Sequence, residues 1–285
     1  MMNSKALWQE LINTITLEES REEVHSILCI VLEALAGLSK ADIMANRPIE
    51  VTPALRDKLN EAVKRLNAHE PVQYVVGESH FFKRTFHVDR RVLIPRPETE
   101  ELVMTVIERI RNKSQPRILD IGTGSGCIAI TLALELPGAE VFATDISDDA
   151  LAIAGSNGEN INAKVTFIKH DILNDDIPIK NLDVIVSNPP YISLAEKVEM
   201  KKNVVDYEPS LALFVSQEDP LVFYKAMALR AKTALRPGGM LAWEINERFG
   251  QEICTVLDQH GYKNICLIKD IAGKERFAIG YSLNV

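Results

Sequence analysis

The chain has 285 residues, 46% of them hydrophobic and 25% charged, which is the balance of a globular protein with a real core. This length favours two domains, and a formal net charge of -8 argues against broad attraction to nucleic acid, which depends on Lys and Arg. No apolar run approaches the ~18 residues of a membrane span, and no secretory leader opens the chain, so we expect a cytoplasmic protein without a membrane partner. The scattered cysteines and histidines lack metal-ligand spacing, so no metal site is predicted.

The N-terminal part of the chain has a helical pattern. Apolar residues over 24–35 recur at the spacing of one helix face, and Gly37 is placed to cap the C-terminus. A second helix is predicted from Thr52, a capping residue type, and ends by Pro71. These helices are too few for a large core of their own. We therefore expect residues 1–75 to form a small all-helical domain, with the role of docking the substrate.

A short segment with β character follows. Residues 72–76 form a β-rich run, and further runs at 81–82 and 86–88 follow Gly77. We therefore expect a hairpin-like linker over residues 76–97. Pro97 suits the first turn of a helix, which marks the beginning of the next domain.

Residues 98–285 alternate between strand and helix patterns. Seven strands are predicted, at 117–121, 140–145, 164–169, 182–187, 239–245, 263–269 and 276–282. Helical patterns follow the first, second, fourth and fifth. This order predicts an α/β fold of Rossmann-like type, with a mostly parallel seven-stranded sheet and ligands at the carboxyl ends of its strands. The short connection through Gly273 predicts that the last two strands form an antiparallel pair at one edge.

The first strand of this sheet ends in a glycine-rich loop. The loop consists of Gly122, Thr123, Gly124, Ser125 and Gly126. Closely spaced glycines let the backbone turn sharply and approach a ligand at the positive end of the following helix. The loop lacks one residue of the dinucleotide spacing Gly-x-Gly-x-x-Gly, which favours S-adenosylmethionine over NAD. A turn required only for packing is the alternative reading.

Two further positions fit the same cofactor. Asp145 ends the second strand, roughly 20 residues beyond the loop, where a carboxylate can accept hydrogen bonds from both ribose hydroxyls. An N-terminal helix cap beside Ser147 is the alternative for this residue. Ile172, next to Asp171 after the third strand, is expected to cover the adenine ring. A solvated turn is the alternative there.

The fourth strand ends in the most informative stretch, Asn188, Pro189, Pro190 and Tyr191. Two prolines fix the backbone and have no N–H, so the carbonyl of Pro189 and the amide oxygen of Asn188 remain as acceptors. Such a pair matches the NH2 group of an amide or a nucleobase, whose nitrogen is a poor nucleophile until it is oriented. We predict Asn188 and Pro189 as catalytic residues, with all four residues binding the substrate. A rigid turn with a core tyrosine is the alternative.

Together these residues resemble the HemK/PrmC family of release factor glutamine N5-methyltransferases. The likeness also covers three further segments: Glu70-Pro71-Val72-Gln73-Tyr74, Leu93-Ile94-Pro95-Arg96-Pro97-Glu98-Thr99-Glu100 and Tyr207-Glu208-Pro209. The resemblance implies a class I S-adenosylmethionine-dependent methyltransferase domain behind the helical domain. It implies the glutamine of the Gly-Gly-Gln loop in peptide chain release factors as substrate, with Asn188 also touching the cofactor. The sequence departs from the family over 214–221.

The same chemistry leaves rival functions open. A nucleic-acid methyltransferase acting on adenine N6 or guanine N2 needs the same acceptor pair, although the acidic charge and the family-specific linker argue against it. A binding protein that kept only the cofactor pocket is a further alternative, against which the intact Asn188 argues. We expect a monomer with release factors as partners and no direct nucleic-acid contact.

Overall fold

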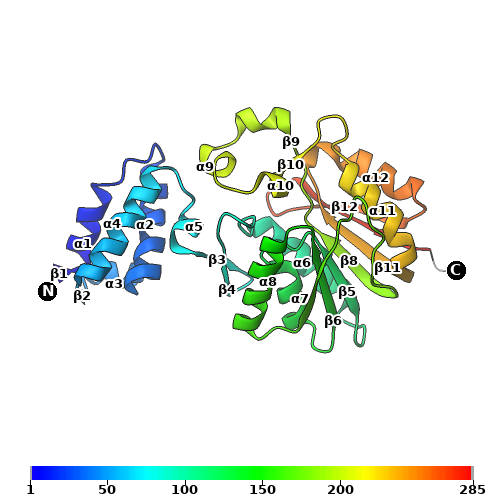
Figure 1. Ribbon diagram of the computed structural model, residues 1–285, viewed down its shortest axis with the longest axis horizontal. Coiled ribbons are helices and arrows are strands. Elements are labelled where there is room, and N and C mark those ends of the chain that lie inside the picture. The colour runs from blue at the N-terminus through cyan, green and yellow to red at the C-terminus, as the bar shows by residue number, and fades with distance from the viewer. Residues whose placement is uncertain (1, 284–285) are drawn as a thin grey trace. The chain divides into compact units, whose positions relative to one another are not determined.

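The computed structural model describes residues 2–283, and these residues form two compact units (Figure 1). The first unit contains the described residues up to Glu78 together with Lys201–Tyr207. The second unit contains Ser79–Met200 and the described residues from Glu208 onward. Within residues 2–283, no helix is long and apolar enough to cross a membrane.

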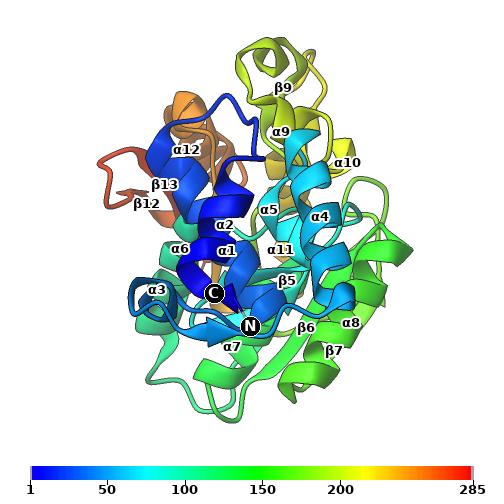
Figure 2. The same ribbon diagram turned by 90° about the vertical axis from the view of Figure 1, so that its left-hand side faces the viewer.

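The first unit is built from helices. They are α1 (Ser4–Ile12), α2 (Arg21–Ala36), α3 (Lys40–Met44), α4 (Pro53–Asn67) and α5 (Val72–Val76), with the short ladder of β1 (Met2–Asn3) and β2 (Pro48–Ile49) and the short α9 (Lys202–Val205). The predicted caps are confirmed: Gly37 is left-handed after α2, and Thr52 Oγ1 accepts from Leu55 N at 3.2 Å. Figure 2 shows α1 and α2 side by side, and α4 also packs on α2. Leu7, Leu28 and Leu59 are fully buried in the resulting core.

The prediction of an extended run at 72–76 was wrong, because these residues form α5. Pro71 starts this helix by accepting a hydrogen bond from Val75 N at 3.0 Å, and Gly77 ends it in the left-handed conformation. The helix buries Val72, Tyr74 and Val75, so tertiary packing outweighs the β preference of its branched residues. The Arg65 guanidinium also fixes this turn by donating to the carboxylate of Glu70 and the carbonyl of Tyr74, each at 2.8 Å.

The second unit begins with a hairpin, which lies within the segment where a hairpin-like linker was predicted. Its strands are β3 (Glu78–Phe81) and β4 (Arg84–His87), with Glu78 falling at the end of the first unit. Phe81 and Phe86 pack edge to face, with ring centroids 6.1 Å apart, and both are buried in the core beside the large sheet. The chain then enters α6 (Pro97–Ile110), with Pro97 in its first turn as predicted.

The large sheet has seven strands in the order β12-β13-β11-β8-β5-β6-β7. They are β5 (Arg117–Ile121), β6 (Glu140–Asp145), β7 (Val165–Lys169), β8 (Leu182–Ser187), β11 (Leu235–Glu244), β12 (Lys263–Lys269) and β13 (Glu275–Tyr281). Six of the seven strands run in the same direction, and β13 is antiparallel to both of its neighbours, β11 and β12. The predicted sheet and its antiparallel edge pair are therefore confirmed.

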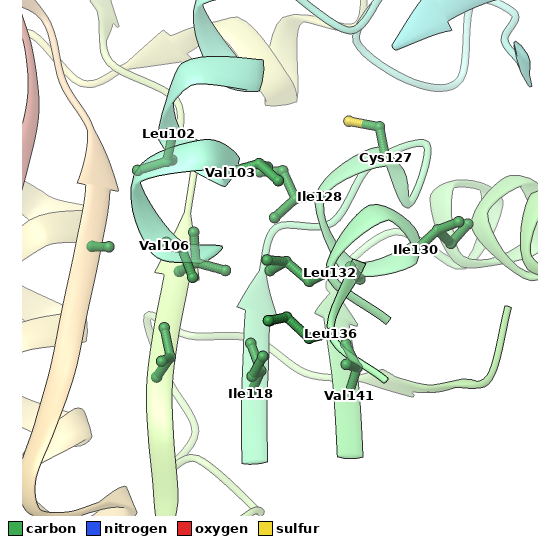
Figure 3. Close-up of a cluster of buried hydrophobic side chains, with 14 of the residues drawn as sticks. Leu102, Val103, Val106, Ile118, Cys127, Ile128, Ile130, Leu132, Leu136 and Val141 are labelled. Carbon is green, nitrogen blue, oxygen red and sulfur yellow. The ribbon is translucent and has the colours of Figure 1, made fainter. Parts of the chain in front are cut away.

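Helices cover both faces of this sheet. One face carries α6, α7 (Cys127–Glu135) and α8 (Asp148–Ile161), and the other carries α11 (Val222–Ala234) and α12 (Gly250–Gln259). Figure 3 shows Val106 of α6 and Leu132 of α7 directed toward each other beside Ile118 of β5. The helix α7 is apolar on all sides because it lies between the sheet and its neighbouring helices.

A long connection between β8 and α11 carries short elements. In the second unit these are β9 (Ile192–Ser193), the 3-10 helix η1 (Leu194–Glu199), α10 (Ser210–Leu213) and β10 (Phe214–Val215). The divergent segment 214–221 thus begins as a short strand, β10, that pairs in parallel with β9 directly after Tyr191. Asp219 closes the segment by accepting from Leu221 N at 3.2 Å.

Candidate active site

A pocket opens at the carboxyl ends of β5, β6 and β8, where the alternating pattern predicted a ligand site. The predicted residues that line it are Gly122, Gly124, Asp145, Ile172, Asn188, Pro189 and Pro190. The loop members Thr123, Ser125 and Gly126 are not among the lining residues, and neither is Tyr191. No cluster of potential metal ligands occurs within the described residues.

The glycines of the loop have two different structural roles, one toward the pocket and one toward the packed helices. Gly122 and Gly124 have positive φ angles of 73° and 55°, and a Cβ atom on either would meet nothing within 4 Å. Gly126 also has a positive φ, but its Cβ would lie 2.9 Å from Ile130 Cδ1 and 3.1 Å from Ala154 Cβ. The first two glycines therefore leave open space for a ligand, whereas Gly126 lets α7 and α8 approach.

Acidic residues hold the loop in place from two strands. Asp145 Oδ2 accepts from Gly124 N at 2.9 Å, and its Oδ1 accepts from Ser147 N at 3.0 Å. Asp120 is fully buried at the end of β5 and accepts from Thr123 Oγ1 at 2.7 Å. Burial raises the pKa of Asp145 and raises the pKa of Asp120 to about 7.

The pocket fits an adenosyl cofactor. Asp145 lines the pocket at the end of β6, and Ile172, Phe223 and Met227 give an apolar wall. His170, Asp171 and Leu173 also line the pocket, so the turn after β7 belongs to the site. The open space over Gly122 and Gly124 accommodates the part of a ligand that crosses the loop.

The predicted tetrapeptide occupies the end of β8. Ser187 Oγ donates to the carbonyl of Ile121 at 2.6 Å, which ties the end of β8 to β5. Asn188 Nδ2 donates to Thr99 Oγ1 at 3.2 Å, and within the described chain its Oδ1 accepts no hydrogen bond. Asn188 lines the pocket, and its amide oxygen has no hydrogen-bond partner within the described chain.

A buried carboxylate behind the tetrapeptide was not foreseen. Glu244, at the end of β11, accepts from Thr99 Oγ1 at 2.6 Å and from the Tyr191 hydroxyl at 3.1 Å. Asn246 Nδ2 donates to the carbonyl of Tyr191 at 3.3 Å. Burial raises the pKa of both Glu244 and Tyr191. The glutamate gave no sequence signal because its partners come from α6 and from the segment after β8.

The linker motif over residues 93–100 also contacts a segment that is distant in the sequence. Arg96 Nη2 donates to Glu208 Oε1 at 2.5 Å, and Glu208 Oε2 accepts from Ile94 N at 3.3 Å. Pro209, Leu211 and Ala212, directly after Glu208, line the pocket. The sequence offered no reason to pair these residues, which are separated by more than a hundred positions.

Comparisons with known proteins agree with this site. The family described as "Methyltransferase small domain" matches residues 100–207, and "PrmC N-terminal domain" matches residues 13–77. A methyltransferase from Pyrococcus furiosus has the same fold, with a TM-score of 0.53 and 20% identity over 79% of this chain and 99% of that one. A release factor glutamine methyltransferase from Bacteroides thetaiotaomicron is 45% identical over 90% of this chain and 91% of its own length. One from Flavobacterium psychrophilum is 42% identical over 90% of each chain.

The fold and the pocket define a class I S-adenosylmethionine-dependent methyltransferase. Within that class, the chain belongs to the family of release factor glutamine methyltransferases, because it is 45% and 42% identical to two such proteins, each over 90% of its length. The resemblance read from the motifs is thereby confirmed.

Proposed function

We propose that this protein transfers a methyl group from S-adenosylmethionine to the side-chain amide nitrogen (N5) of the glutamine in the Gly-Gly-Gln motif of peptide chain release factors. Family membership supports the acceptor. The observation that carries the chemistry is the Asn188 amide, whose nitrogen is held by Thr99 while its oxygen remains available at the pocket.

The residues of the chain contribute to the reaction by orienting the substrate amide relative to the cofactor. The bound cofactor supplies an electrophilic methyl group on sulfur. Asn188 Oδ1 and the Pro189 carbonyl each accept one N–H of the substrate amide, which directs the nitrogen toward that methyl group. Taking up the methyl group would give the amide nitrogen a positive charge and make it acidic, so one of its protons can leave to water and no general base is assigned. Pro190 fixes the backbone of the acceptor carbonyl, because its ring restricts φ.

Cofactor contacts are proposed for the loop and for its neighbours. Backbone groups over Gly122, Thr123, Gly124, Ser125 and Gly126 form the loop against which the cofactor lies. Asp145 accepts from the ribose hydroxyls and Ile172 covers the adenine. Tyr191 supports the substrate site through its hydroxyl on Glu244, and the contact of its ring with the substrate amide stays a prediction.

The substrate assignment is tested with purified unmethylated release factors. Incubation with the enzyme and the cofactor is expected to add 14 Da to the peptide that carries Gly-Gly-Gln, located by tandem mass spectrometry. Label on tRNA or DNA, with none on a release factor, would replace this function by the nucleic-acid alternative. The net charge of -8 favours the protein substrate.

The helical unit is proposed to bind the body of the release factor, because recognition of one loop in a folded partner needs contacts beyond a single side chain. Removing residues 1–75 should raise the KM for intact release factor more than the KM for a short Gly-Gly-Gln peptide. Cofactor affinity measured by calorimetry serves as the control for the remaining unit. Equal changes in both KM values would contradict docking.

We also expect a cytoplasmic monomer, which light scattering and cell fractionation test.

A further inference from the structure

The tetrapeptide Asn188–Tyr191 is held at both ends by one buried carboxylate. Tyr191 donates directly to Glu244 Oε1, at 3.1 Å. Asn188 reaches the same carboxylate through Thr99, whose hydroxyl lies 3.2 Å from Asn188 Nδ2 and 2.6 Å from Glu244 Oε2. Glu244 and Thr99 are 1% and 3% exposed, so water does not compete for these bonds.

Glu244 determines which group donates in each hydrogen bond of the series Asn188–Thr99–Glu244. Two hydroxyl donors and the nearby charge of Arg276 favour the ionised form of Glu244, against the effect of burial. An ionised carboxylate has no proton to donate, so the Thr99 hydroxyl gives its only proton to Glu244. The Thr99 oxygen can then only accept from Asn188, which requires the NH2 side of the Asn188 amide to face Thr99. The oxygen side is left facing the pocket.

This direction matters because the two ends of an asparagine amide have nearly the same shape. A flipped Asn188 would present an NH2 group to the NH2 group of the substrate, and two donors cannot bond to each other. The wrong orientation would therefore repel the substrate amide, although the backbone would be unchanged.

We propose that Glu244 is a positioning residue that, through Thr99, sets the orientation of the Asn188 amide and thereby makes it an acceptor for the substrate NH2 group. The inference rests on the proposed function for the identity of the acceptor. Glu244 of β11 and Thr99 of α6 thus affect the reaction through Asn188, although neither of them lines the pocket.

The test compares single-turnover methylation of release factor by two isosteric variants and one conservative variant. Glu244→Gln introduces an NH2 group that can donate to Thr99, Thr99→Val removes the hydroxyl, and Thr99→Ser retains it. We expect the first two to slow transfer by about 100-fold, with cofactor affinity within about threefold of wild type, since only transition-state positioning is lost. Thr99→Ser should recover to within about fivefold of wild type.

The matched control is Asp183→Asn, another buried carboxylate on the same sheet, bonded to Lys113 Nζ at 2.9 Å and Arg117 N at 3.0 Å. It lies in β8 near the opposite end from Asn188 and should lower the melting temperature while leaving the transfer rate of the folded protein within about twofold. The double variant Glu244→Gln/Thr99→Val should be no slower than the slower single variant, because both act through one chain of bonds. Multiplicative losses, or Thr99→Val at wild-type rate, would overturn the proposal.

A second measurement does not depend on the acceptor. In protein labelled with 15N-asparagine, the side-chain NH2 signal of Asn188, assigned by its loss in Asn188→Ala, should shift in Thr99→Val and stay in Asp183→Asn. An unchanged signal in Thr99→Val would contradict the inference. If wild type labels nucleic acid instead of release factor, the proposed function fails, and the same rate ratios on that acceptor still decide the role of Glu244.

Discussion

Arg96 and Glu208 form an ion pair at 2.5 Å that joins the linker motif to the segment preceding the pocket wall at Pro209. The Glu208 side chain is 1% exposed and the Arg96 side chain is 32% exposed. The pair is therefore shielded more than an ordinary surface ion pair, and the backbone N–H of Ile94 adds a further donor.

Replacing Arg96 by Met should leave a buried carboxylate without its main partner. We expect a loss of about 1–3 kcal/mol in the free energy of unfolding, measured by urea denaturation. Lys169→Met, which breaks the exposed pair with Asp148, is the control and should cost less than about 1 kcal/mol. Adding Glu208→Gln to Arg96→Met should restore part of the loss. No recovery would mean that the charge of Glu208 is not the cause.

Asn188→Ala removes the side-chain acceptor while its neighbours keep the backbone turn. We expect methyl transfer to fall by about 100- to 1,000-fold, as for the removal of one preorganised hydrogen-bonding group at a transition state. Cofactor affinity, measured by calorimetry, should stay within about threefold. Unchanged turnover would remove Asn188 from the mechanism.

Two glycine substitutions should distinguish a role in cofactor binding, expected for Gly124, from a role in helix packing, expected for Gly126. Gly124→Ala places a methyl group in open space at the pocket, so it should weaken cofactor binding by about tenfold and cost about 1 kcal/mol of stability through its positive φ. Gly126→Ala meets Ile130 and Ala154 and should destabilise the fold by about 1–3 kcal/mol. Calorimetry and thermal melting of both proteins distinguish the two effects, and equal effects on both quantities would contradict the division.

The buried carboxyl of Asp120 predicts a pH dependence of stability. Its pKa rises from an ordinary 3.8 to about 7 in the folded protein, mainly because burial disfavours the charged form. Its contribution to stability is fully present below pH 3.8 and is lost as the pH rises toward about 7, because the unfolded chain releases the proton first. Relative to Asp120→Asn, the melting temperature of the wild type without cofactor should therefore fall between pH 4.5 and 7.5, roughly spanning this window. If the melting temperatures of the two proteins changed with pH in the same way across that range, the raised pKa of Asp120 would be contradicted.

The sequence by itself determined the seven strands of the large sheet and the two motifs of the site. The strands of the large sheet show clear hydrophobic patterns, and the ends of β5 and β8 carry residue types with special backbone properties, such as Gly122 and Pro189. These signals are local, because a glycine loop or a proline pair restricts its own backbone wherever the chain places it. The rule that ligands meet the carboxyl ends of parallel strands then brought both motifs to one pocket.

Only the tertiary structure decided which polar groups meet behind that pocket. Glu244 bonds to Thr99 across 145 positions, and Glu208 bonds to Arg96 across 112, so no spacing rule could pair them. The helix at Val72–Val76 was misread for the same physical reason: burial against neighbouring helices outweighed the local β preference of its residues. Long-range burial sets the partners of a carboxylate, and in this protein one of those partners, Thr99, holds the amide of Asn188 at the pocket.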